Sequence, residues 1–331
     1  MMREYRFDVV RVVCMTYLVA YFHLYGYVYP QGGDAVSQPV RMAMAHACLG
    51  LFTFVSGYLL GRKYSFGQQG NAGLWTFYKK RILRVIPLFV VASLALWLIG
   101  FNRGRATLNG LLCISPFVDP KPGTMYYIPL ILWCYLVTPL IARRGLGWRV
   151  GASLSVFLLL LVARFLFPSI DSRFVFNVFF YLVGLVSASC FDWSFRQPWG
   201  SVVKTVAVLA FGLLVAVAVR RSLLSGYAAQ MLAGALGVFV VLLVCEGISR
   251  LGGRRLVSMV SYASMACYLF HRFFYWAAEN VWNPAPLSQM ALYGRHRVPR
   301  NTAAVLCHTE AVRPFPQFGK PLGCSVGMSN W

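Results

Sequence analysis

The first long apolar segment is RFDVVRVVCMTYLVAYFHLYGY. It carries Asp8 and Arg11 near its start and His23 deep inside it. A charged group costs about 2.5–3.5 kcal/mol at the centre of a lipid-inserted helix, so such residues are expected to line a polar cavity or a site. A neutral imidazole can take a proton from a hydroxyl group, or it can act as a nucleophile and form a covalent intermediate. His23 is therefore the candidate catalytic residue, and a histidine that only hydrogen-bonds within a helical bundle is the alternative.

Arg11 and His23 lie twelve residues apart. On an ideal α-helix this spacing separates them by about 18 Å along the axis and about 120° in direction, so they cannot touch. One helix could then hold the charged end of a long donor molecule at Arg11 and its reactive end at His23. Arg81 and Arg84 are further candidates for binding phosphate, because guanidinium groups bind phosphate oxygens with two hydrogen bonds. Lipid headgroups are their alternative partner.

The composition indicates a polytopic membrane protein. Of the 331 residues 59% are hydrophobic and 12% are charged, which lies outside the range of soluble domains. The net charge of +22 comes from basic residues scattered between apolar runs, so it is explained by topology and anionic lipid, and no nucleic-acid partner is expected. The nine cysteines show no C-x-x-C spacing, and neither a disulfide framework nor a metal site is expected.

Runs long enough to cross a bilayer predict an all-α transmembrane bundle of nine to ten spans. Nine can be placed, near residues 9–29, 40–61, 83–100, 125–142, 150–168, 174–191, 202–219, 227–248 and 259–281. Segment 106–118 is too short to span and is expected at the interface. Lys and Arg concentrate in the loops on the side of the N-terminus, which predicts a cytoplasmic N-terminus in an inner (cytoplasmic) membrane.

The chain is divided into a transmembrane bundle, residues 1–282, and an atypical C-terminal tail, residues 283–331. From Gly294 the tail has prolines, no membrane-length apolar run and no helical period. A disordered tail is one explanation. The other is a shift of the reading frame near residues 293–295, with the loss of a final span. An apolar stretch in an alternate frame of the gene would support the second.

Several motifs occur in order across residues 6–275 and carry a family resemblance. They are Arg6-Phe7-Asp8-x-x-Arg11 with His23, Phe54-Val55-Ser56-Gly57-Tyr58-Leu59-Leu60, Arg81-Ile82-Leu83-Arg84-Val85-Ile86-Pro87, Tyr127-Ile128-Pro129-Leu130, and Ser261-Tyr262 through Tyr268-Leu269-Phe270-His271. Together they resemble the integral-membrane acyltransferase 3 family, polytopic enzymes that O-acylate bacterial surface glycans.

The resemblance implies a reaction and its participants. An acyl-CoA donor, expected to be acetyl-CoA, would bind on the cytoplasmic side with its phosphates at Arg11, Arg81 and Arg84. His23 would be catalytic, and the acceptor would be a sugar hydroxyl reached from the other side of the membrane. No cofactor would be permanently bound. The bundle would complete the transfer itself or pass the acyl group to a separate transferase partner.

One feature departs from the family pattern. The family usually has ten residues between its Arg and its His, which leaves the two side chains about 20° apart on a helix. Here eleven residues intervene. Either the helix is locally over- or underwound, or one of the two residues is paired wrongly with the motif.

Two more residues are candidates for substrate binding. Ser56 could orient a substrate, or Ser56-Gly57 could serve close helix packing. His271 could contact the acceptor or belong to a second acid–base pair, and anchoring at the membrane interface is its alternative. For the whole chain, a transporter of a small solute is the alternative to the enzyme, and a membrane sensor or assembly factor without catalysis is a third reading.

Overall fold

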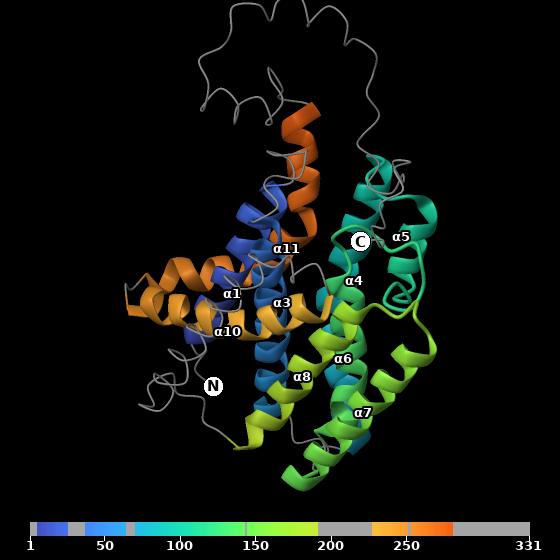
Figure 1. The fold of residues 1–331 in the computed structure, drawn as a ribbon, viewed down its shortest axis with the longest axis vertical. Helices are drawn as coiled ribbons and strands as arrows, with labels where there is room; N and C mark the ends of the chain where they lie inside the picture. The colour runs from blue at the N-terminus through green and yellow to red at the C-terminus, as the bar shows by residue number, and fades with distance from the viewer. Residues whose placement is uncertain are drawn as a thin grey trace, which may run out of the picture.

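The computed structural model describes residues 5–25, 37–63, 70–142, 144–190, 227–250 and 253–280. In these ranges the regular structure is helical (Figure 1). The elements are α1 (Tyr5–Thr16), the π-helix η1 (Tyr17–His23), α3 (Ser37–Lys63), α4 (Gly70–Leu98), α5 (Gly104–Leu111), α6 (Tyr127–Ile141), α7 (Leu146–Leu166), α8 (Ser172–Cys190), α10 (Tyr227–Arg250) and α11 (Arg254–Asn280). The predicted all-α fold is confirmed.

The predicted spans overlap helices wherever the structure describes them. Segments 202–219 and 283–331 lie outside the described residues, so the seventh predicted span and the tail are not among these elements. Five of the described helices are long and apolar enough to cross a membrane, and α6 is a shorter apolar helix. Segment 106–118 holds α5, which has only eight residues. The count of nine to ten spans stays a prediction.

The third span begins earlier than its apolar run predicts. Helix α4 starts at Gly70 and has 29 residues, so the basic stretch from Lys79 to Arg84 lies within the helix and not in a loop. Residues three apart on a helix share a face. Arg81 and Arg84 therefore project from α4 on one side. The predicted span, which begins at residue 83, did not indicate that the whole basic stretch is helical.

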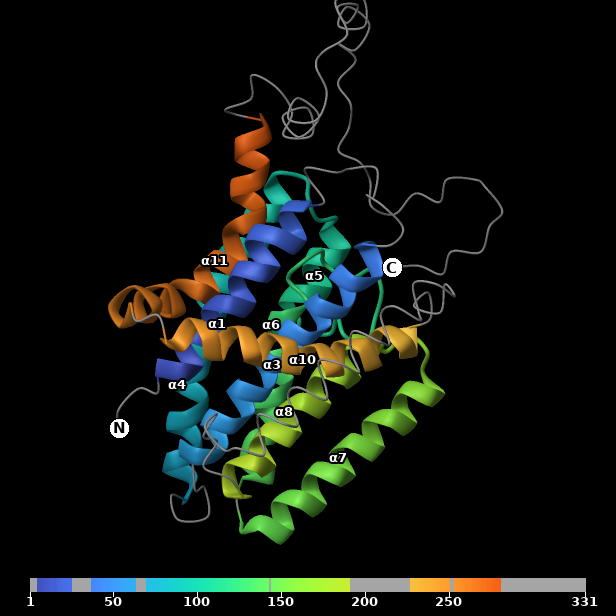
Figure 2. The same cartoon turned by 60° about the vertical axis from the view of Figure 1, so that its left-hand side comes forward.

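The packing centre of the bundle is the crossing of α3 and α8, which lie side by side in Figures 1 and 2. A Cβ atom on Gly57 would lie 2.2 Å from the Tyr181 carbonyl oxygen, and one on Gly184 would lie 2.2 Å from the Phe54 carbonyl oxygen. The two backbones can be this close only because both residues lack a side chain. Helix α10 crosses α3 on another face, where Gly234 lies against His46.

The edge of the bundle is apolar and exposed. Helix α7 lies at the side of the bundle in Figure 2, and only 11% of its most apolar window is buried within the protein. Large exposed side chains such as Leu158, Leu159 and Phe165 occupy it. A lipid environment accounts for such a surface, because hydrocarbon chains are as apolar as leucine.

Helices α1 and α11 run side by side in the same direction and are joined by polar contacts. The Ser261 hydroxyl donates to a carboxylate oxygen of Asp8 at 2.7 Å near the start of both helices. At the other end of α1 and η1, a nitrogen of His23 lies 2.5 Å from a nitrogen of His271. Residue numbers therefore rise together along α1 and α11, and the two helices place the candidate site between them.

Candidate functional site

The π-helix η1 changes the direction in which His23 points. A π-helix bonds i to i+5 and so turns less per residue than an α-helix. With about 100° per residue from Arg11 to Tyr17 and about 80° from Tyr17 to His23, the two side chains come within about 20° of the same direction. The expected separation of 120° is therefore wrong for this chain. The helix is locally underwound, which was one of the two open alternatives.

The cavity-lining residues mark the face of α1 that begins with Arg11. Arg11, Met15 and Leu18 of α1 and η1 line one cavity at intervals of four and three residues. A further α-helical step of three or four would select Tyr21 or Phe22, whereas the wider step of five selects His23. The π-helix thus brings His23 onto the face that begins with Arg11.

Helix α11 holds the π-helix at a backbone carbonyl. The Tyr275 hydroxyl donates to the Val19 carbonyl oxygen at 2.6 Å, one turn before His23. Tyr275 lies one turn beyond His271, and the two rings have centroids 5.6 Å apart. The π-helix and the second histidine are therefore fixed by the same segment of α11.

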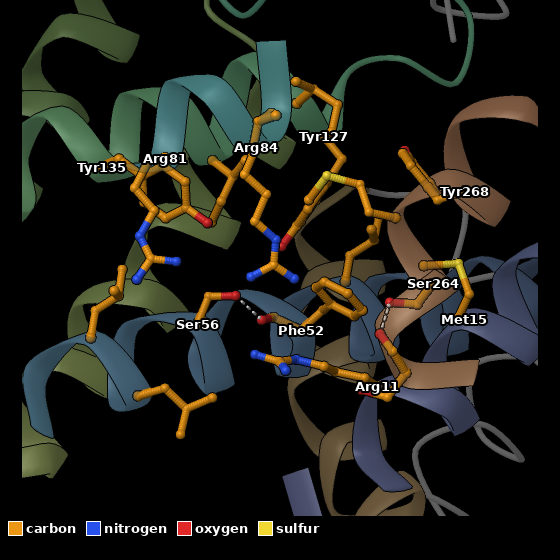
Figure 3. Close-up of a pocket in the computed structure, with 18 of the residues that line it drawn as sticks. Arg11, Met15, Phe52, Ser56, Arg81, Arg84, Tyr127, Tyr135, Ser264 and Tyr268 are labelled. Atoms are coloured by element: carbon orange, nitrogen blue, oxygen red, sulfur yellow. Dashed lines mark hydrogen bonds between the residues drawn. The ribbon is translucent and has the colours of Figure 1, made fainter. Parts of the chain in front are cut away.

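A cavity of about 180 Å³ lies between α1, α3, α4, α6 and α11. Among the described residues that line it are four cationic side chains and no carboxylate. The cations are Arg11, Lys63, Arg81 and Arg84. Figure 3 shows the three guanidinium groups pointing into the space beside Ser56. An unbalanced positive cluster of this kind suits a polyanion such as a phosphate ester.

Two of the arginines have contacts that orient them. An Arg11 guanidinium nitrogen lies 3.8 Å from an Asp8 carboxylate oxygen, and that carboxylate is buried and already accepts from Ser261. The Arg81 guanidinium lies 5.6 Å from the centroid of the Tyr135 ring. These contacts hold the cations at the cavity wall.

The structure separates the two readings of Ser56-Gly57. Gly57 faces α8 and permits the close backbone contact described above. Ser56 faces the other way, lines the cavity and donates its hydroxyl hydrogen to the Phe52 carbonyl oxygen at 2.9 Å. Packing is thus the role of the glycine, and the serine remains a candidate for substrate binding.

His23 and His271 form a direct pair. Nδ1 of His23 lies 2.5 Å from Nε2 of His271, and the ring centroids are 4.7 Å apart. Nδ1 of His271 lies 2.6 Å from the Tyr268 carbonyl oxygen, and His271 is buried. His271, which the sequence predicts to bind substrate, therefore contacts the predicted catalytic residue itself, a contact that the sequence did not predict.

The candidate residues fall into two neighbouring groups. Arg11, Arg81, Arg84 and Ser56 share the cavity, whereas the histidine pair lies outside its lining. Tyr268 connects them, because its side chain lines the cavity while its carbonyl oxygen binds His271. The Tyr268 hydroxyl in turn donates to the Thr124 carbonyl oxygen at 2.5 Å. The sequence marked Tyr268 only as part of a motif and as an interface aromatic.

The tyrosine contacts carry a weak sequence signal. Tyr268, His271 and Tyr275 are spaced by three and four residues, which places them on one face of α11. That spacing can be seen in the sequence, but the partners cannot. Val19 and Thr124 accept through backbone carbonyls, and a carbonyl leaves no trace in residue type.

The helices and this arrangement define a multi-pass membrane protein with a cationic cavity next to a pair of histidines, of which His271 is buried and His23 half-buried. Residues 4–297 match the family model described as an acyltransferase domain, which covers most of the chain. The protein belongs to this acyltransferase family, the predicted resemblance is confirmed, and the protein is an acyltransferase. Comparison with curated proteins found no match. Comparison with solved structures also found none.

Proposed function

We propose that this protein transfers an acyl group, most simply acetyl, from cytoplasmic acyl-CoA to a hydroxyl group of a cell-surface or lipid-linked glycan. The observation that carries the proposal is the cavity with four cations that ends at Tyr268, whose carbonyl oxygen holds the His23–His271 pair. The acyltransferase family supports the class of reaction. The acyl-CoA donor and the glycan acceptor are what the resemblance to the family implies, and the cationic cavity fits the phosphates of such a donor.

The cationic cavity is the proposed donor site. Arg11, Arg81 and Arg84 bind the phosphates of CoA through charge-assisted hydrogen bonds, and Ser56 lies within the same space for the more distal part of the donor. Arg11 and His23 are separated by roughly 16–18 Å along the helix axis. A long donor is needed to bridge that distance, and a pantetheine arm with a terminal thioester has this elongated form.

His23 is the proposed base. Its free ring nitrogen takes the proton of the acceptor hydroxyl as the oxygen forms a bond to the acyl carbon. The carbon–sulfur bond then breaks, the thiolate of CoA leaves, and the imidazolium returns the proton to it. An acyl-His23 intermediate divides the same transfer into two steps and uses the same nitrogen.

The proposal places the N-terminus in the cytoplasm of a bacterium and the protein in the inner membrane. Arg11, Lys63, Arg81 and Arg84 then lie at the cytoplasmic end of the bundle, in agreement with the positive-inside rule and with the location of acyl-CoA. The histidine pair lies towards the opposite face, from which the glycan approaches. Transfer occurs within the bundle or through a separate transferase that receives the acyl group.

The test follows radioactive label from [14C]acetyl-CoA into the glycan fraction of membranes that contain the full chain. Replacing His23 by Gln is expected to lower the transfer rate about 10²- to 10⁴-fold, the usual contribution of a general base. The matched control is His46→Gln, because His46 is a buried histidine that packs against Phe176 outside the site. Full transfer by the His23 variant at normal membrane abundance would overturn the proposal.

A second pair of variants tests the donor site. Arg84→Gln is expected to raise the KM for acetyl-CoA about 10- to 150-fold, since a charge-assisted contact contributes about 1.5–3 kcal/mol. Arg255→Gln is the control, because Arg255 is exposed at the start of α11 and does not line the cavity. Uptake of an intact solute without transfer of label would support the transporter alternative instead.

A further inference from the structure

The hydrogen bonds of His271 determine where its own proton is. Its Nδ1 lies 2.6 Å from the Tyr268 carbonyl oxygen. A carbonyl oxygen can only accept, so Nδ1 of His271 must carry the hydrogen. In a neutral imidazole the other nitrogen is then an acceptor. His271 is 3% exposed, and a ring that is buried to this degree is more stable when neutral.

The same reasoning extends to His23. Nε2 of His271 is the acceptor, and Nδ1 of His23 lies 2.5 Å from it. Nδ1 of His23 must therefore be the donor and carry the hydrogen. The remaining nitrogen of His23, Nε2, is left with a lone pair and without a proton. One backbone carbonyl thus sets the proton positions in two rings.

We propose that His271 is a positioning residue that fixes the tautomer of His23, so that Nε2 of His23 is the atom that handles the proton during acyl transfer. The inference rests on the proposed function and deepens it. The juxtaposition that carries it is the chain Tyr268 carbonyl, His271, His23. His271 contacts neither the donor cavity nor its cations, and it acts on the reaction through His23 alone.

A histidine suits this position better than a carboxylate does. In hydrolase triads a carboxylate orients the histidine and stabilises its imidazolium form. Within a membrane a buried carboxylate carries a large cost, whereas a neutral imidazole can accept the same hydrogen bond without it. When His23 takes up the acceptor's proton, its Nδ1 hydrogen can shift towards His271 Nε2, and the positive charge is spread over two rings.

The surroundings of the pair limit what else could set the tautomer. The charged and titratable side chains that face it are Arg272, Tyr268 and Tyr275, all from α11. The hydroxyls of Tyr268 and Tyr275 donate to the carbonyl oxygens of Thr124 and Val19. A guanidinium cannot accept a hydrogen bond. Among the described residues, Nε2 of His271 is the acceptor that lies within hydrogen-bond distance of Nδ1 of His23.

The first test uses two amides of different length in the full chain in membranes. In His271→Gln the carboxamide reaches the place of Nε2 and can accept the His23 hydrogen. In His271→Asn it reaches only the place of Nδ1, so His23 loses its acceptor. We expect kcat for label transfer from [14C]acetyl-CoA to fall about 10- to 100-fold in the Asn variant, the scale for loss of an orienting partner of an imidazole. The Gln variant should stay within about threefold of the parent protein, and KM for acetyl-CoA should not change in either.

A pH profile distinguishes positioning from packing. In His271→Glu a carboxylate would face His23 and favour its protonated form, so the acid limb of kcat should move to higher pH. A residue with only a packing role would change the height of the profile and not its position. Membrane abundance of each variant, measured in parallel, shows whether the chain inserts.

The outcomes separate this inference from the proposed function. Equal losses in the Gln and Asn variants, equal retention in both, or an unmoved acid limb in the Glu variant would overturn the role of His271. If His23→Gln is inactive while His271→Asn transfers at the parent rate, the proposed function stands and the inference fails. If His23→Gln is fully active, the proposed function itself fails.

Discussion

Two helix contacts in this bundle are built in opposite ways. Helices α3 and α8 approach through Gly57 and Gly184, where the absence of side chains lets the two backbones touch. Helices α1 and α11 are joined by hydrogen bonds in which the side chains of Asp8, His23 and Tyr275 take part. The first kind of contact can only fix distance, whereas the second holds groups that can bind anions and exchange protons. The site is found at the second.

The cavity of the site borders on both contacts. Ser56 lies next to Gly57, so the glycine contact fixes the depth at which Ser56 enters the cavity. Arg11 lies on the helix that Asp8 and Ser261 tie to α11. A rigid contact on one wall and polar contacts on the other therefore define the cavity between them.

The largest effect is expected from disturbing the glycine contact. Gly184→Ala would place a methyl group 2.2 Å from the Phe54 carbonyl oxygen and force the helices apart. Overpacking of this kind costs about 1–3 kcal/mol, which should lower the Tm measured in detergent by several degrees. Gly151→Ala is the control, because a Cβ atom at Gly151 meets nothing within 4 Å. Equal Tm values for the two variants would remove the distinction between the contacts.

A smaller and more specific effect is expected from the polar contact. Tyr275→Phe removes only the hydroxyl that binds the Val19 carbonyl oxygen in the π-helix. A hydrogen bond of about 1 kcal/mol corresponds to roughly a fivefold change. The kcat of acyl transfer should fall by about that factor, and the Tm should change little. Tyr262→Phe is the matched control, since Tyr262 is exposed, and a similar fall in both would exclude a special role for Tyr275.

The smallest effect is expected from a polar contact outside the membrane-spanning helices. Burial alone would raise the pKa of Asp171, but the hydrogen bonds and charge of Arg173, with Lys121, lower that pKa below its ordinary value. A carboxyl group with a lowered pKa stabilises the fold above its unfolded pKa, and that stability is lost as the pH falls through the folded pKa.

The measurement is the Tm between pH 7 and pH 3 for the parent protein and for Asp171→Asn. The difference in Tm between them should correspond to less than about 1 kcal/mol of stability at neutral pH, and it should vanish towards pH 3. Lys121 lies 3.7 Å and Arg173 2.6 Å from the Asp171 carboxylate, so the neutral variant loses both ion pairs. A constant difference across this range would show that the contact works through shape and not through charge.

Much of the fold follows from the sequence because a bilayer imposes simple rules. Apolar runs of sufficient length must be helices, since backbone polar groups have no other partners in hydrocarbon. The places of α3, α7 and α8 were therefore predictable. The start of α4 was not, because the basic residues Lys79, Lys80 and Arg81 precede the apolar run and yet belong to the helix.

The candidate site was predictable in its residues and not in its connections. Residue types alone indicate that Arg11, Arg81 and Arg84 can bind anions and that His23 can move a proton. The pairing of His23 with His271 joins residues 248 positions apart, and it depends on how α1 and α11 pack. The carbonyl of Tyr268 contributes as much as either ring and has no signature in the sequence.

The sequence by itself determined that this chain is a helical membrane protein with an acyltransferase's motifs, because hydropathy and residue chemistry are local properties. Only the tertiary structure decided that Arg11 and His23 share a face, that Ser56 faces a cavity while Gly57 faces α8, and that His271 meets His23. Each of these depends on the turn per residue of a helix or on the approach of two helices. Both are set by packing over the whole bundle and not by any short stretch of residues.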